Sequence, residues 1–329
     1  MTPPSAAAAR LDSIPTALPK KRPSARSAPA RADRPFRGIA LILASTAFLG
    51  CSDATAKYLS QTLPAIEITW IRFLVFALIM LPSMLPGTPL YAMRADRMSL
   101  QIMRGITLLS SSLFFISGLS FLPIAEASAT GFVAPLFVTA LSIVFLGERV
   151  GLRRWLATAV GLLGVVIILR PGSSAFHPAA ILPVISALAW AGTLIMTRMM
   201  SGRDRAVTTM AYSAITGFAV VSLLVPAVWV APSWHDILCG VLIGVASTAG
   251  QWIVVLAFRY ADASVLAPFS YTQLVVVSTL GFILFGELPD VWTVTGAAFI
   301  VASGLYTAHR ERVGRSQLSA VAAESSPNA

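Results

Sequence analysis

The chain has 329 residues, of which 56% are hydrophobic and only 12% are charged, and its mean hydropathy is +0.78. An ordinary soluble domain carries about 25% charged residues, because polar side chains must cover its surface. The composition therefore excludes a soluble enzyme and a nucleic-acid-binding protein. It predicts an all-α polytopic membrane protein, in which apolar helices of about 20 residues each cross the bilayer.

Residues 1–37 form a basic extension with eight Lys or Arg and two Asp, whereas the rest of the chain has a net charge of only +4. The extension is rich in Pro, Ala and Ser and lacks the apolar segment of a secretory signal peptide. This pattern predicts a disordered cytoplasmic tail that opposes translocation and lies beside anionic lipid. Residues 310–329 are predicted to form a second disordered cytoplasmic tail.

Ten apolar stretches lie between the two tails, and Pro residues punctuate most of the short connections. They predict about ten transmembrane helices, at residues 38–60, 64–84, 98–121, 123–147, 150–169, 178–200, 206–230, 234–258, 262–286 and 289–309. With the N-terminus inside, 20 of the 24 Lys and Arg residues are cytoplasmic and only Arg170 is external. Both termini are therefore predicted to be cytoplasmic.

Two short patterns occur twice along the chain. The tetrapeptide at 125–128, Ala-Glu-Ala-Ser, resembles the one at 261–264, Ala-Asp-Ala-Ser, and each is followed by a Gly-Glu pair, at 147–148 and 286–287. The acid-to-acid spacing is 22 residues in the first copy and 25 in the second. Each copy contains five predicted spans, an odd number, so the second copy should be inverted in the membrane. Inverted repeats are typical of alternating-access carriers, whose solute site lies between the two halves.

The motifs that carry these repeats resemble those of a known family. Residues 121–128, Ala134-Pro135-Leu136, 146–149 and Arg170-Pro171-Gly172 are similar to a first EamA repeat. Residues 263–268, Tyr271-Thr272-Gln273 and Phe285-Gly286-Glu287 are similar to a second. The chain resembles the drug/metabolite transporter superfamily over about residues 38–309, with one repeat at 38–170 and the other at 178–309. The resemblance implies a bundle of two inverted five-helix halves around a central cavity. It also implies a solute of a broad class that includes amino acids, metallophores, S-adenosylmethionine and riboflavin.

Charged side chains inside membrane spans are costly, which makes them candidates for function. Asp53 and Lys57 are four residues apart and lie on one face of the first span. Arg72 enters the second span from the same side of the membrane, so we expect the three charges to gather. They form either an ion-pair network that only fixes two helices, or a gate or binding site for the solute headgroup. A third alternative is proton coupling through Asp53, which the neighbouring Lys57 disfavours.

The remaining candidates are polar groups at various depths. Glu126 and Asp262 are the repeat-related acids, expected at opposite faces of the membrane as gates or as carboxylates at helix N-termini. Arg104 either extends to the cytoplasmic interface or contacts an anionic solute. Gln251, Tyr271 and Gln273 are expected to bond across helices or to line the cavity. Glu148 and Glu287, each beside Gly at a span end, are expected to be structural.

The sequence contains no pattern for covalent, metal or nucleotide chemistry. None of its three lysines follows a glycine, which excludes a Walker A loop, and its three histidines lie at span ends without ligand spacing. No cofactor is expected. We predict a secondary transporter of a small organic metabolite in the inner membrane of a bacterium, as a monomer or homodimer, with protons or another ion as possible coupling partners. A flippase for a lipid-linked substrate and a non-transporting scaffold are the alternatives.

Overall fold

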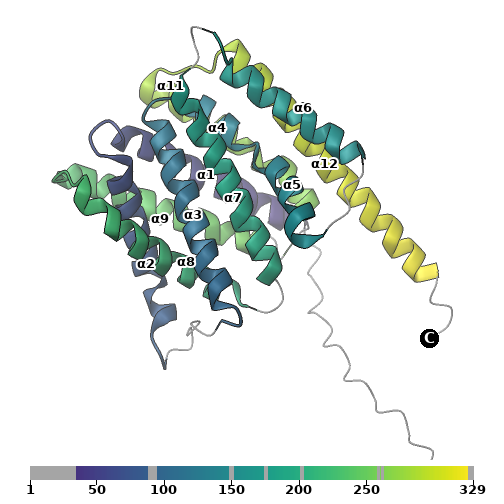
Figure 1. Ribbon diagram of the computed structural model, residues 1–329, viewed down its shortest axis with the longest axis horizontal. Coiled ribbons are helices and arrows are strands. Elements are labelled where there is room, and N and C mark those ends of the chain that lie inside the picture. The colour runs from purple at the N-terminus through teal and green to yellow at the C-terminus, as the bar shows by residue number, and fades with distance from the viewer. Residues whose placement is uncertain are drawn as a thin grey trace, which may run out of the picture. The chain divides into compact units, whose positions relative to one another are not determined.

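The computed structural model describes residues 35–87, 95–147, 152–173, 177–200, 204–257, 260 and 263–324, and these residues contain helices and no strand. The helices of the first half are α1 (Pro35–Leu59), α2 (Ala65–Met84), α3 (Met98–Leu119), α4 (Ile124–Gly131), α5 (Ala134–Leu146) and α6 (Leu152–Leu169). Those of the second half are η1 (Pro178–Ala180), α7 (Ile181–Met200), α8 (Ala206–Leu224), η2 (Val225–Ala227), α9 (Trp234–Ala257), α10 (Ala263–Ser270), α11 (Thr272–Phe285) and α12 (Val291–Glu324). Figure 1 shows their arrangement.

Within the described residues, seven helical segments are long and apolar enough to cross a membrane. Three shorter apolar helices, Trp155–Leu169, Thr272–Phe285 and Val291–Tyr306, fall within three further predicted spans. Large apolar side chains such as Leu223 and Val144 are 82% and 74% exposed, as lipid-facing residues are. The chain is therefore a multi-pass helical membrane protein.

Two predicted spans are interrupted, at equivalent places in the two halves. The span at 123–147 is divided into α4 and α5, and the span at 262–286 into α10 and α11. Pro135 is the second residue of α5 and Pro268 precedes the second break by three residues, so each lacks the N–H that a continuous helix would use. Both interrupted spans end at a glycine in the left-handed region, Gly147 with φ 66° and Gly286 with φ 68°. These are the two glycines of the predicted Gly-Glu pairs.

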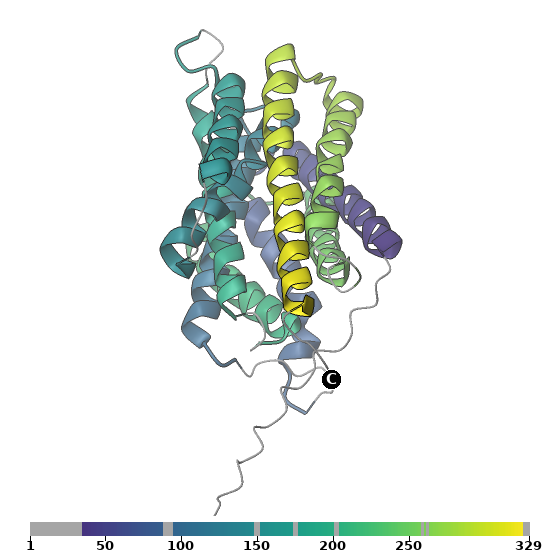
Figure 2. The same cartoon turned by 90° about the vertical axis from the view of Figure 1, so that its right-hand side faces the viewer.

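Three of the helix–helix contacts have a counterpart, in which each helix is replaced by the equivalent helix of the other half. The α1–α9 pair corresponds to α7–α3, α2–α9 to α8–α3, and α1–α11 to α7–α5. The α2–α8 and α6–α12 pairs are their own counterparts, and Figure 2 shows α12 running through the length of the bundle. At the α6–α12 crossing, a Cβ added to Gly164 or Gly296 would overlap the carbonyl oxygen of the other glycine. The two backbones therefore touch.

Close packing also occurs at two glycines on α9 that are four residues apart. A Cβ at Gly240 would overlap Ile71, and one at Gly244 would overlap Val75, both on α2. These glycines therefore allow the two helices to pack closely. At the other end of the chain, the structure differs from the prediction: α12 continues to Glu324 through residues expected to be disordered. Residues 310–324 include three Arg, three Ala and two Glu and no Pro, a composition that favours helix.

Candidate functional site

A small central cavity of about 10 Å³, room for about one water molecule, lies between α2, α3 and α9. Its lining combines two aromatic rings with polar groups: Arg72, Phe73, Phe76, Leu108, Ser112, Ser247 and Gln251. The Ser112 hydroxyl is buried and has no hydrogen-bond partner among the described residues. A buried polar group without a partner is costly, so its position on the cavity wall indicates that a water or solute atom satisfies it.

Asp53 connects this cavity to the second half of the chain. The Gln273 side chain on α11 donates a hydrogen bond from Nε2 to Oδ2 of Asp53 on α1, with a distance of 3.0 Å. Asp53 also interacts electrostatically with Arg72, whose half-buried guanidinium has no hydrogen bond or ion pair to any described residue. The site thus combines two opposite charges from the first half with amide groups of Gln251 and Gln273 from the second. It can hydrogen-bond a solute and still offers free donors on Arg72.

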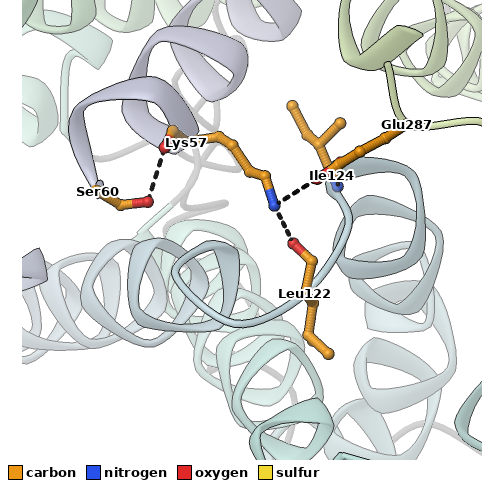
Figure 3. A network of polar contacts seen from close by, with 5 residues as sticks. All are labelled: Lys57, Ser60, Leu122, Ile124 and Glu287. Carbon is orange, nitrogen blue, oxygen red and sulfur yellow. Dashed lines mark hydrogen bonds and ion pairs between the residues drawn. The ribbon is translucent and has the colours of Figure 1, made fainter. Parts of the chain in front are cut away.

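The structure separates Lys57 from Asp53, although both were expected to face the same way. Lys57 Nζ forms an ion pair of 3.0 Å with Glu287 Oε1 and donates a hydrogen bond of 2.5 Å to the Leu122 carbonyl oxygen. The second carboxylate oxygen of Glu287 accepts a hydrogen bond of 3.0 Å from the Ile124 backbone N–H. Figure 3 shows Lys57 between these two partners. The cluster ties the C-terminal end of α1 to the α3–α4 and α11–α12 connections.

Sequence analysis did not identify Glu287 as part of this cluster, because a carboxylate beside a helix-ending glycine suggested a local structural role. Glu287 instead binds the first residue of α4, a different helix. The cluster borders a recess of about 380 Å³, lined by Lys57, Ser60, Gln61, Leu119, Ser120, Leu284, Phe285 and Glu287. On the predicted orientation, this outer recess opens on the external side.

A second ion pair lies nearby, between Arg170 at the end of α6 and Asp290 before α12, with a distance of 2.5 Å. Burial alone would raise the pKa of Asp290, but hydrogen bonds from Thr293 and the charge of Arg170 together lower this pKa below its ordinary value. Glu126 is in the first turn of α4, where the helix dipole favours a carboxylate, and it interacts electrostatically with Arg170 and Lys57. It does not line the central cavity.

Arg104 holds three helices together. Its Nε donates to Thr197 Oγ1 on α7 at 2.7 Å, and its Nη1 donates to Ser213 Oγ on α8 at 2.5 Å. A weaker contact of 3.4 Å joins it to the Thr209 carbonyl oxygen. Arg104 was expected either to extend to the cytoplasmic interface or to contact an anionic solute. Its bonds to α7 and α8 indicate a third role, in the packing of three helices. Position along a helix gives no signal for such partners.

The breaks in the two interrupted spans meet through aromatic rings. Phe132, between α4 and α5, contacts Tyr271, between α10 and α11, with ring centroids 5.2 Å apart. A Cβ at Gly304 would overlap the Tyr271 hydroxyl, so the Tyr271 ring also lies against α12. Tyr271 is therefore a packing residue at the crossing of the two broken spans. Asp262 lies outside the described residues.

Comparison with known proteins identifies the chain. Residues 36–170 and 177–307 each match the model of the EamA-like transporter family, and together they cover most of the sequence. The chain belongs to the EamA-like transporter family. A protein of known crystal structure matches this transporter with a TM-score of 0.57 at 21% identity, covering 84% of this chain and 98% of that one. This similarity supports the fold alone.

Named relatives of this EamA-like transporter move several kinds of solute. An S-adenosylmethionine uptake transporter of Rickettsia felis is 28% identical over 281 residues, covering 85% of this chain and 95% of that protein. A riboflavin transporter of Vibrio cholerae is 28% identical and covers 82% of this chain and 92% of that protein. The pseudopaline exporter CntI of Pseudomonas aeruginosa is 28% identical and covers 81% and 94%. The family is thus clear, and the relatives include both uptake and export proteins.

Proposed function

We propose that this transporter is a secondary carrier of a small polar organic metabolite and that the solute binds in the central cavity. The observation that carries the proposal is the Arg72 guanidinium, which lines the cavity without a hydrogen bond to the described residues and faces the charge of Asp53. A packing role alone would leave this costly cation without its hydrogen bonds. A solute with an anionic or carbonyl group supplies them.

The proposed architecture is ten spans in two inverted five-helix repeats. Two family matches of similar length support this arrangement, as do the helix pairs that exchange between halves. The reciprocal contact of Gly164 and Gly296 on α6 and α12 is what a two-fold axis in the membrane plane produces. In such carriers the site opens alternately to each side as the halves rock against each other.

The solute class follows from the relatives and the cavity together. S-adenosylmethionine and riboflavin each combine a planar ring system with several polar groups, and Phe73 and Phe76 provide apolar walls beside Arg72 and Gln251. The cavity of about 10 Å³ is far smaller than the range of about 300–1,000 Å³ typical of small-molecule pockets. Binding a solute of this size therefore requires the helices around the cavity to move apart.

We infer an inner-membrane location in a bacterium, with both termini in the cytoplasm, from the bacterial relatives and the distribution of Lys and Arg. The lipid bilayer and one small solute are then the principal partners. The energy source is the gradient of an ion or of the solute itself, and Asp53 and Glu126 are the carboxylates available for ion coupling near the cavity and the external end.

Solute counterflow in proteoliposomes tests the proposal, because it requires no knowledge of the coupling ion. The panel contains S-adenosylmethionine, riboflavin, amino acids and nucleosides, and the variants are Asp53→Asn and Arg72→Gln. Asp290→Asn is the matched control, since it removes an acid that does not line the central cavity. We expect counterflow of one solute class with the wild type and the control, and none with the cavity variants. Wild-type rates in both cavity variants would refute the site.

A further inference from the structure

The outer recess differs from the central cavity because its charges are already paired. Lys57 and Glu287 form its ion pair, and their side chains remain 11% and 26% exposed. An ion pair whose role is only structural needs no open volume beside it. Here the pair borders a recess of about 380 Å³.

Both members of the pair retain unused bonding capacity. The Lys57 ammonium has three donors, of which two are directed to Glu287 and to the Leu122 carbonyl. The Glu287 carboxylate has about four acceptor positions, of which Lys57 and the Ile124 N–H use two. One cationic donor and about two anionic acceptor positions are therefore available within a few ångströms of each other.

This arrangement selects a particular class of ligand. A free anion gains from Lys57 but is repelled by Glu287, and a free cation meets the reverse, since the pair is neutral overall. A group that carries both charges side by side can bind both residues at once, with its dipole opposed to that of the ion pair. An α-amino carboxylate has this geometry, because its ammonium and carboxylate are attached to one carbon.

We propose that the outer recess binds the zwitterionic α-amino carboxylate end of the transported solute, with the carboxylate on Lys57 and the ammonium on Glu287. This inference rests on the proposed transport function and narrows its solute class. The rest of the solute lies against Phe285, whose ring centroid is 5.8 Å from Lys57 Nζ, and the amide of Gln61. S-adenosylmethionine has such an end, whereas riboflavin is a neutral molecule without one.

Binding in this mode also affects the connections that the pair holds. A solute carboxylate competes with Glu287 and the Leu122 carbonyl for the donors of Lys57. Loosening these bonds frees the end of α1 from the α3–α4 and α11–α12 connections. Occupation of the recess is thereby linked to movement at one end of the bundle.

Competition in the counterflow assay tests the inference with the full chain in proteoliposomes. Each amino-acid-type solute, including S-adenosylmethionine, is compared with its decarboxylated analogue and with its N-acetylated analogue. Each charge-assisted bond is worth about tenfold to a hundredfold in affinity, so either analogue should compete that much less well. In Glu287→Gln the N-acetylated analogue should compete as well as the parent solute, while the decarboxylated analogue should still compete less well; these losses of competition are the two penalties. In Lys57→Gln the decarboxylated analogue should compete as well as the parent solute, while the N-acetylated analogue should still compete less well. Asp290→Asn, at the ion pair outside the recess, should keep both penalties.

The outcomes separate the two proposals. Equal competition by a zwitterion and its analogues in the wild type overturns the inference, and this comparison requires no variant to fold. Counterflow of riboflavin without competition by any zwitterion also overturns it, while the proposed transport function stands. No counterflow of any panel member by folded, correctly inserted protein counts against both. Loss of both penalties in Asp290→Asn would show that the recess does not set them.

Discussion

Replacing Asp53 with Asn removes one charge beside the central cavity, where it interacts with the lining residue Arg72, and changes the shape of the side chain very little. The Asn carbonyl can still accept the hydrogen bond from Gln273, although a bond to a neutral acceptor is worth about half of one to a carboxylate. Arg72 loses its opposing charge at the same time. Breaking a buried ion pair from one side costs about 3–5 kcal/mol, and we expect about 2 kcal/mol here because the two side chains are half-buried and form no direct ion pair.

We therefore expect Asp53→Asn to destabilise the protein by about 2 kcal/mol and to abolish counterflow, because Arg72 beside the cavity loses its opposing charge. The double variant Asp53→Asn, Arg72→Gln removes both charges, so it should recover most of the stability and none of the transport. Thermal unfolding in detergent and counterflow in proteoliposomes measure the two effects. A double variant no more stable than the single one would refute the electrostatic coupling of the two residues.

Three further predictions concern the scaffold. Arg104→Gln should lower the stability measured by thermal unfolding by about 2–3 kcal/mol, because the hydrogen bonds to Thr197 and Ser213 are lost. Arg104→Lys should not restore this stability, since one ammonium cannot reproduce the planar set of donors of the guanidinium. Gly296→Ala should cost about 1–3 kcal/mol, seen as a lower yield of monodisperse protein, because its Cβ overlaps the Gly164 carbonyl. Deleting residues 2–30 should leave counterflow unchanged, since the predicted transport core begins after them; loss of activity in correctly inserted protein would show that the tail takes part.

The positions of the helices could be predicted from the sequence because each one is an apolar stretch bounded by polar residues or Pro. The expected spans at 64–84 and 178–200 agree with the observed helical segments within one residue. The breaks after Gly131 and Ser270 could not be predicted by the same signal. Apolar residues continue through the first break, and the polar run at 270–273 is too short to divide an apolar stretch. Pro135 and Pro268 were visible, but a helix in a membrane tolerates Pro when neighbours satisfy the freed groups.

The pairing of charges was harder to predict than their depth. Spacing places Asp53 and Lys57 on one face of α1, and the structure agrees that both lie on the protein side of the helix. Four residues correspond to about 6 Å along the axis, and a Lys side chain is long enough to extend that distance again. Lys57 therefore reaches Glu287 while Asp53 bonds with Gln273. Such partners depend on which helices become neighbours, and hydrophobic periodicity does not contain that information.

On the proposed inverted-repeat architecture and solute site, the distribution of charge between the two halves would let a symmetric scaffold bind an asymmetric solute. A cavity with full two-fold symmetry would bind the solute equally well in two opposite orientations. Here the charged groups, Asp53 and Arg72, come from the first half, and the second half contributes the amides of Gln251 and Gln273. Only one orientation therefore places a charged end of the solute against charged protein groups.

On the proposed function, the charges on and beside α1 would offer a path to a zwitterionic solute. Lys57 and Glu287 form an ion pair at the outer recess. Asp53 lies about one helical turn deeper on α1 and interacts electrostatically with Arg72 on α2, with no direct ion pair between them. In a low-dielectric interior, a zwitterion that left one such pair would lose a large electrostatic stabilisation unless another lay within reach. A spacing of about 6 Å lets the ammonium approach Asp53 while the carboxylate is still near Lys57. The order of charges along α1 thus provides successive binding positions between the recess and the central cavity, and a transporter of neutral solutes has no need of that order.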